Sequence, residues 1–226
     1  MCKLKQLTEI IEPIPDGATI MVGGFGSPGT PFSLLAELLR QGKRNLTIIK
    51  NDANQDGYGV SRLIEAGVVS KLLTTHLGLS APARRANLAG SLHVEFFSQG
   101  LFAERIRCAG VGLPGVLSDI ELPDELGATR QSVVVAGRTL FFESAITADY
   151  ALLRADKADA FGNLSYRGAA RNFSPLMAMA ADQVFVEARS ITNEPLDPDS
   201  IHTPGTYVSG LTQVAGDSYE YQPIRR

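Results

Sequence analysis

Hydrophobic positions in the N-terminal half alternate between short continuous runs and runs with helical spacing. Continuous apolar runs of about four to eight residues predict buried strands, and apolar residues three or four positions apart predict amphipathic helices. This alternation with short connections predicts an α/β fold with a mainly parallel sheet flanked by helices on both faces. The predicted strands are residues 18–22, 45–50, 68–75 and 94–97, and the predicted helices are residues 3–14, 31–41, 58–66, 82–89 and 101–108.

The pattern changes in the second half of the chain. Residues 111–127 contain several prolines and glycines without any period, so we expect them to be irregular. Residues 189–226 also lack a helical period, and we expect one domain over residues 1–226 with 189–226 as a wrapping C-terminal tail. The other predicted elements are a β-hairpin excursion with strands at 132–135 and 139–142, a strand at 150–155, a helix at 174–181 and a last core strand at 184–187.

Composition narrows the choice of partners. The 226 residues are 44% hydrophobic and 20% charged, which is typical of a globular protein that buries a sizeable core. The formal net charge of −3 argues against nucleic acid as the main partner. No apolar run reaches membrane-spanning length, and the N-terminus lacks the apolar core of a signal peptide. With only two cysteines, we expect a cytoplasmic protein without a disulfide framework, a nucleic-acid partner or a membrane partner.

Residues 16–31 combine a turn, a predicted strand, a glycine-rich loop and a helix start. Four glycines within seven positions let the backbone approach a ligand where a Cβ atom would block it. Thr30 suits the N-cap of the following helix, and Pro31 suits its first position. Loop N–H groups and the helix N-terminus would then face an anion or a polarised carbonyl. A tight strand-to-helix turn without a ligand is the alternative.

Residues 24–29 also fit the G-x-G-x-x-G pattern of dinucleotide-binding proteins, and Asp52 stands where a ribose-binding acid is expected. In that motif the helix begins inside the glycine pattern. Pro31 would then lie past the first turn, where proline costs about 3 kcal/mol. The pattern therefore favours a longer, more open loop, with an NAD-binding oxidoreductase as an alternative function.

Two amide side chains follow other predicted strands. Asn51 comes after the strand at 45–50, and Gln99 comes after the strand at 94–97. Ligands of open α/β sheets bind beyond the carboxyl ends of the strands. Neutral amide donors there suit a carbonyl or thioester oxygen that gains charge during acyl transfer. A turn residue and a helix start are the structural alternatives for Asn51 and Gln99.

Four blocks of the sequence resemble the alpha subunit of family I coenzyme A transferases, the 3-oxoacid and acetate/acetoacetate CoA-transferases. Each fixed position of the family signature in the first block is met: an acidic residue, Gly, three apolar residues, Gly-Gly-Phe, Gly and Pro. The blocks appear in order and span nearly the whole chain. They are residues 16–31, 97–107, 162–173 and 202–205.

The resemblance implies the CoA-transferase (NagB/RpiA-like) fold and assigns roles to particular residues. Asn51 and Gln99 match positions on the acyl-substrate or oxyanion side, and Arg171 and Asn172 are possible further contacts. Asp52 departs from the family, which commonly has a second amide there. The loop that would bind CoA or its thioester consists of Gly23, Gly24, Phe25, Gly26, Ser27, Pro28 and Gly29.

The resemblance also implies a ping-pong CoA transfer between short-chain acids, with coenzyme A as a substrate and no permanently bound cofactor. The nucleophilic glutamate of the family lies in a Ser-Glu-Asn-Gly-type motif of the beta subunit, and no such motif occurs here. We therefore expect no catalytic residue in this chain, a beta-subunit partner in an α2β2 assembly, and a structural role for Glu143. No metal-ligand spacing is present.

Two points stay open at this stage. Residues 115–123 depart from the family after the Gly-Val-Gly-Leu-Pro run at 110–114, so the acid specificity can differ from acetoacetate. A non-catalytic sensor of sugar phosphates or acyl-CoA on a similar fold is a second alternative function. Arg167, Arg171 and Asn172 either bind a carboxylate or tie their loop to the sheet, and we favour the structural role.

Overall fold

The computed structural model describes residues 3–121 and 130–214. Its main sheet has eight strands in the order β11-β10-β8-β1-β2-β3-β4, with β9 paired to β8 beside this path. Every pair along that path is parallel, and only β9 runs antiparallel to its neighbour. The strands are β1 Thr19–Val22, β2 Leu46–Ile49, β3 Val69–Thr74, β4 His93–Phe96, β8 Ala148–Asp159, β9 Leu164–Ser165, β10 Ala181–Thr192 and β11 Gly210–Gln213.

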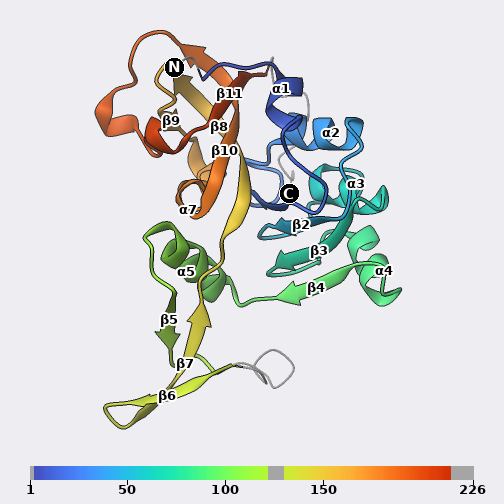
Figure 1. The fold of residues 1–226 in the computed structure, drawn as a ribbon, viewed down its shortest axis with the longest axis vertical. Helices are drawn as coiled ribbons and strands as arrows, with labels where there is room; N and C mark the ends of the chain where they lie inside the picture. Colours follow the sequence, from blue (N-terminus) through green and yellow to red (C-terminus); the bar gives the residue numbers. More distant parts are fainter. Residues whose placement is uncertain (1–2, 122–129, 215–226) are drawn as a thin grey trace, which may run out of the picture.

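Helices cover both faces of this sheet, as the sequence predicts (Figure 1). Strand residues alternate between the two faces: Ile20 of β1 packs with the first group of helices, and Met21 packs with the second. No helix among the described residues is long and apolar enough to cross a membrane. The first group is α1 Leu7–Ile11, α2 Phe32–Arg40, α3 Gly59–Glu65 and α4 Ala81–Leu88, and the second is α5 Gln99–Gly110 and α7 Ser174–Ala180.

A three-stranded antiparallel sheet, which we call the arm, projects from the body below α5 (Figure 1). Its strands are β5 Gly115–Ser118, β6 Ser132–Val135 and β7 Arg138–Ser144. The predicted hairpin is confirmed: Ala136 and Gly137 have φ values of 50° and 75°, which suit a two-residue hairpin turn. The prediction of irregular structure for 111–127 is wrong at β5, whose pairing with β7 no local pattern reveals.

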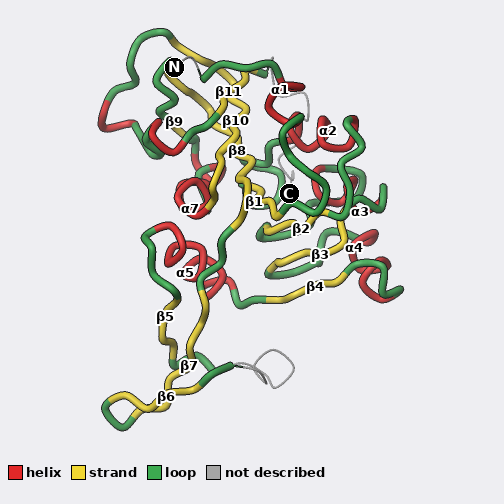
Figure 2. Tube along the Cα trace, viewed as in Figure 1, coloured by secondary structure: helices red, strands yellow, loops and turns green. Residues whose placement is uncertain are grey.

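The predicted strands at 150–155 and 184–187 are too short. β8 and β10 each run for twelve residues and pair along most of that length (Figure 2). Charged residues in their outer halves, such as Arg154 and Arg189, interrupt the apolar run and hide the extension. The strand at 184–187 is also not the last one, because residues 210–213 form β11 beside β10.

The ends of the chain differ from expectation for the same reason. Residues 189–226 are not simply a wrapping tail, since they begin inside β10 and supply β11, while 215–226 lie outside the described residues. The helix predicted over 3–14 is limited to α1, because Leu4 forms a bridge with Leu211 and the chain before α1 is extended. In both places a tertiary pairing overrides the local pattern.

Candidate functional site

The candidate site lies at the carboxyl ends of the parallel strands. Residues 23–29, hereafter the glycine loop, follow β1; Asn51 follows β2; and Gln99 follows β4 as the first residue of α5. Because these strands are parallel, their carboxyl ends lie along the same edge of the sheet. The structure thus places all three predicted groups at one edge. It buries Asn51 completely and leaves Gln99 exposed.

The glycine loop folds tightly on itself. Phe25 N donates to Pro28 O at 3.0 Å, and Thr30 N donates to Ser27 O at 3.1 Å. Gly24 has a φ of +91°, and a Cβ atom there would lie 2.5 Å from Thr30 N. Only glycine fits this position, because both the φ value and the close backbone approach exclude a side chain. The loop is therefore a compact turn fixed by its own backbone.

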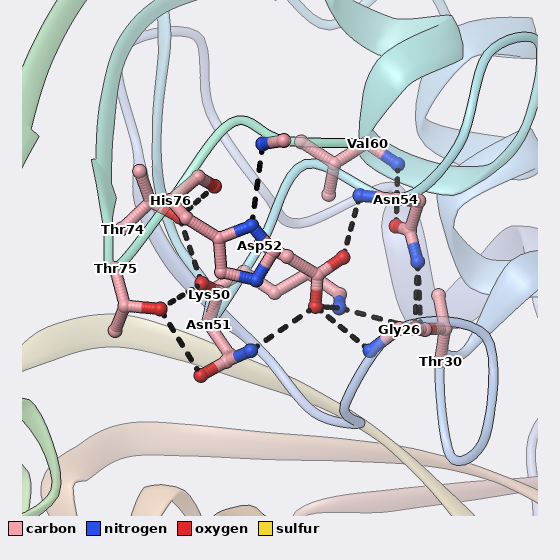
Figure 3. A network of polar contacts seen from close by, with 11 residues as sticks. Gly26, Thr30, Lys50, Asn51, Asp52, Asn54, Val60, Thr74, Thr75 and His76 are labelled. Atoms are coloured by element: carbon pink, nitrogen blue, oxygen red, sulfur yellow. Dashed lines mark hydrogen bonds and ion pairs between the residues drawn. The ribbon is translucent and has the colours of Figure 1, made fainter. Parts of the chain in front are cut away.

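A polar cluster from the β2–α3 connection fixes the loop from below (Figure 3). Gly26 N donates to Asp52 Oδ2 at 2.7 Å, and Gly26 O accepts a hydrogen bond from Asn54 Nδ2 at 2.7 Å. Lys50 Nζ lies 3.1 Å from Asp52 Oδ2 and 3.3 Å from Gly26 O. Both polar groups of the Gly26 residue are thereby held, which sets the position of the loop relative to β2.

Lys50 and Asp52 form a buried ion pair, with side chains 0% and 2% exposed. Burial lowers the pKa of Lys50, although the Asp52 carboxylate opposes this shift. Burial acts to raise the pKa of Asp52, but the charge of Lys50 and the Gly26 and Asn54 amides outweigh it and bring that pKa below its usual value. The carboxylate at the position where the family commonly has an amide is therefore part of the loop support.

We expect Lys50→Met to lower the free energy of unfolding by about 3–5 kcal/mol, because it leaves the Asp52 charge buried without a partner. Urea unfolding measures this loss. The matched control is Lys71→Met on β3, since Lys71 pairs with Glu95 at 2.6 Å but both side chains are more than a third exposed. An exposed pair contributes at most about 1 kcal/mol. Equal losses in the two variants would contradict the buried-pair interpretation.

Asn51 belongs to the same cluster. Its carbonyl oxygen accepts hydrogen bonds from Thr74 Oγ1 at 3.0 Å and from Thr75 Oγ1 at 2.8 Å. Its side-chain amide makes longer contacts, at 3.4 Å to Asp52 Oδ2 and 3.4 Å to Thr75 Oγ1. The backbone of Asn51 is therefore firmly held, whereas its side-chain amide is held loosely enough to exchange these contacts for a ligand.

The N-terminus of α2 does not face a ligand, which corrects the sequence interpretation. Pro31, rather than Thr30, is the N-cap, and the Thr30 hydroxyl donates to Gly26 O at 2.7 Å. The buried carboxylate of Glu187 on β10 accepts from Leu34 N at 3.0 Å and pairs with Arg154 at 2.6 Å. Burial raises the pKa of Glu187, while Arg154 and the α2 amides oppose that shift. The first turn of α2 is thus already occupied by the chain's own anion.

The loop that includes Arg171 and Asn172 packs against the glycine loop. A Cβ atom on Gly29 would lie 2.4 Å from Ala170 O, and one on Gly23 would lie 2.8 Å from Ser174 Oγ. Arg171 is exposed, whereas Asn172 Oδ1 and Ser174 Oγ are buried without a hydrogen-bond partner. The two polar atoms without partners make this contact a candidate ligand position in addition to its structural role.

A cavity of about 520 Å³ borders the glycine loop. Its lining includes Ser27 and Pro28 from the loop, and Arg154, Arg167 and Arg189 from the far side. Asn51 and Gln99 do not line it, and no hydrogen bond joins Gln99 to the loop among the described residues. The structure therefore connects the loop to Asn51 through Asp52, and it places Gln99 at the same sheet edge without direct contact.

Sequence reasoning missed Lys50, Asn54 and Glu187. A lysine at the end of an apolar strand is the one local signal, because a buried lysine requires a nearby acid. Nothing local indicates Glu187, which reaches α2 from a strand 153 positions away in sequence. Glu143, which the sequence assigned a structural role, is buried in β7 beside two arginines.

Comparisons with known proteins identify the family. The family model described as Coenzyme A transferase matches residues 4–213. The alpha subunit of the acetate CoA-transferase of Escherichia coli (strain K12) is 39% identical, covering 92% of this chain and 96% of that protein. The corresponding A-type chain of the 3-oxoadipate CoA-transferase of Pseudomonas putida is 38% identical, covering 94% of this chain and 93% of that protein.

A solved structure shows the same fold. An acyl-CoA transferase from Escherichia coli O157:H7, in its thioester complex with CoA, superimposes with a TM-score of 0.85 at 22% identity. The match covers all of this chain and about half of that longer chain. At this identity the likeness supports the fold alone, while the family model and the relatives above carry the assignment. The chain belongs to the coenzyme A transferase family.

Proposed function

We propose that the chain is the alpha subunit of a heteromeric CoA-transferase that moves CoA between short-chain carboxylic or 3-oxocarboxylic acids. The observation that carries this proposal is the rigidly held glycine loop beside Asn51, at the carboxyl edge of the sheet in a chain of this family. Relatives named for acetate and 3-oxoadipate support the class of acid. The protein acts in the cytoplasm, as one domain, in an α2β2 complex.

The proposed reaction is ping-pong. A glutamate carboxylate from the beta subunit first attacks the carbonyl carbon of an acyl-CoA, the C–S bond breaks, and CoA leaves as a thiolate from an acyl–glutamyl anhydride. The thiolate then attacks the glutamyl carbonyl, which releases the first acid and forms a glutamyl-CoA thioester. A second acid enters, and the same steps in reverse transfer CoA to it. Coenzyme A is a substrate, and the reaction requires no permanently bound cofactor.

The glycine loop supplies a wall with free donors for this chemistry. Within the described residues, the amide N–H groups of Gly24, Ser27 and Gly29 make no hydrogen bond, while those of Phe25 and Gly26 are used to hold the loop. Preorganised N–H groups stabilise an oxygen that gains negative charge during acyl transfer. We assign the loop to the thioester, Asn51 and Gln99 to the acyl side, and Arg171 and Asn172 to possible further contacts.

The nucleophile belongs to the partner in this proposal. Glu143 is 3% exposed and lies 2.8 Å from Arg130 and 3.8 Å from Arg105, so its carboxylate is neither accessible nor free. Glu187 is buried under α2. A carboxylate that attacks a bound thioester must be exposed to it. This arrangement favours a shared active site over an NAD-dependent or purely sensory role.

The test is a transfer assay with the complex of this chain and its beta subunit. Acetoacetyl-CoA and acetate are mixed with the complex, and chromatography follows acetyl-CoA against free CoA. We expect acetyl-CoA to accumulate with little free CoA, because transfer excludes water. Free CoA alone would indicate a hydrolase, and a nicotinamide-dependent absorbance change would indicate the alternative oxidoreductase.

Gln99→Ala is expected to reduce kcat by about ten- to hundredfold while the melting temperature stays within about 2 °C of the parent. The lower end applies because Gln99 is exposed and water replaces part of its donation, whereas a fully enclosed oxyanion donor contributes ~10²–10³. Steady-state kinetics and thermal unfolding of the complex give the two values. A change in melting temperature without a change in kcat would show that Gln99 is a structural residue.

A further inference from the structure

A second cavity, of about 780 Å³, lies between the main sheet and the arm. It is lined by β4 and the start of α5 on one side and by β7 and Arg130 on the other. None of its lining residues belongs to the cavity beside the glycine loop. Its size falls within the range of small-molecule sites, and its lining includes Ser98, the residue before Gln99.

The interior of this cavity carries an excess of positive charge. Glu143 is its buried acid, and two guanidinium groups face it: Arg130 Nη1 at 2.8 Å and Arg105 Nη1 at 3.8 Å. The side chains of Arg130 and Arg105 are only 9% and 17% exposed. Two buried cations against one buried anion leave one positive charge that an anionic ligand would compensate.

The two arginines differ in what they have left to donate. Arg105 is fully engaged, because Nε donates to Ser144 O at 2.6 Å and Nη2 donates to Ser144 Oγ at 2.9 Å. Arg130 lies over the Phe141 ring at 4.1 Å and uses Nη1 for Glu143 and for Ile120 O. Its Nε is buried and has no hydrogen-bond partner. Arg130 is therefore held in a fixed orientation with an unused donor.

Ser98 provides the second unused donor. It is the N-cap residue of α5, yet its side chain makes no capping hydrogen bond, and its Oγ is buried without a partner. A serine at an N-cap normally accepts a hydrogen bond from the first turn of the helix. Buried polar atoms without partners are rare, and here two of them belong to residues that line one cavity.

We infer that this cavity is a carboxylate-binding subsite, which holds the second carboxylate of a dicarboxylic acid substrate on Arg130 and Ser98. The inference rests on the proposed CoA transfer and adds the class of acid to it. A carboxylate oxygen supplies the acceptor that both unused donors lack, and its charge compensates the excess positive charge. The planar guanidinium matches a carboxylate in geometry.

The carboxylate bound here is the one that does not react. The reacting carboxylate loses its charge when it becomes an anhydride and then a thioester, so a fixed buried cation would stabilise its ground state and slow the reaction. Neutral donors such as Asn51 and Gln99 suit that group. A cation held by Glu143 and Phe141 suits a carboxylate whose charge is constant throughout the reaction.

The test uses two acceptor acids that differ only at the far end, 3-oxoadipate and 3-oxohexanoate, with the complex of both subunits. We expect kcat/KM to be higher for 3-oxoadipate. Arg130→Gln should lower kcat/KM for 3-oxoadipate by about ten- to hundredfold, as expected for one hydrogen bond to a charged group, and change that for 3-oxohexanoate less than about threefold. Ser98→Ala leaves the Glu143 ion pairs intact and should lower the 3-oxoadipate value by about fivefold.

Arg138→Gln is the matched control, because Arg138 lies at the exposed tip of the arm, pairs with Asp119 and does not line the cavity. It should leave both acids unchanged. Calorimetric titration of the complex with adipate and with hexanoate tests binding without turnover, and only adipate should bind in an Arg130-dependent manner. Equal losses for both acids, or no preference in the parent enzyme, would overturn the subsite while leaving CoA transfer standing. If no acid is a substrate, the proposed function fails, and adipate binding still decides the cavity.

Discussion

Gly24→Val will remove CoA transfer, with a loss of kcat of at least about a hundredfold, while the circular dichroism spectrum of the complex stays native. A Cβ atom at residue 24 would lie 2.5 Å from Thr30 N, 2.6 Å from Gly29 C and 2.7 Å from Pro28 O. All three are backbone atoms, so the loop itself must move. A displacement of about 1 Å at a reacting group costs on the order of a hundredfold in rate.

The physical reason differs from the one that the sequence suggests. The sequence suggests that a side chain would block the approach of the thioester, whereas the structure shows that it would first collide with the loop. Gly26→Ala is therefore the matched control. Gly26 also has a positive φ, +61°, but a Cβ atom there would lie 3.9 Å from its nearest neighbour, Pro28 Cδ. We expect less than about a tenfold loss there, and near-normal turnover of Gly24→Val would refute the assignment of the loop.

The sequence predicts the body of the fold well where packing follows local periodicity. The strand before the glycine loop and the helix after it lie within one residue of the predicted bounds. The Ala136–Gly137 turn was predictable too, because few sequences combine such a turn with two flanking β-rich runs. In these segments the local pattern and the tertiary contacts favour the same structure.

The errors occur where a distant partner decides the structure. β5 forms because Val116 pairs opposite Glu143, and β11 forms because Leu211 pairs opposite Val186. The extended chain around Leu4 depends on β11 in turn. Strand propensity is weak in such segments, and the pairing of the neighbouring strand determines their conformation.

The candidate site shows the same division. The positions of the glycine loop, Asn51 and Gln99 follow from a general property of parallel sheets, so the sequence is sufficient to predict them. The support of the loop is not predictable in this way. It depends on the buried pair of Lys50 and Asp52 and on hydrogen bonds to one residue of the loop, which arise only when β1 and β2 are placed side by side.

Purified without its partner, the chain should transfer no CoA and form no glutamyl-CoA thioester. A nucleophilic carboxylate must be exposed at the acyl site, and the acids that the structure places close to this edge of the sheet are engaged otherwise. Asp52 holds the glycine loop, Glu187 caps α2, and Glu143 is paired with two arginines. Freeing any of them would require breaking a buried charge pair, which costs about 3–5 kcal/mol.

Addition of the beta subunit should restore activity and place the covalent adduct on the partner. The two subunits, separately and mixed, are incubated with acyl-CoA, treated with borohydride, and mapped by peptide mass spectrometry. Glu143→Gln serves as the internal control: it should alter stability without abolishing the adduct, because Glu143 stays 3% exposed between Arg105 and Arg130. An adduct on a glutamate of this chain without partner would refute the shared site. The chain contributes binding and charge stabilisation, and such groups lower the barrier only when a nucleophile from elsewhere meets the thioester that they hold.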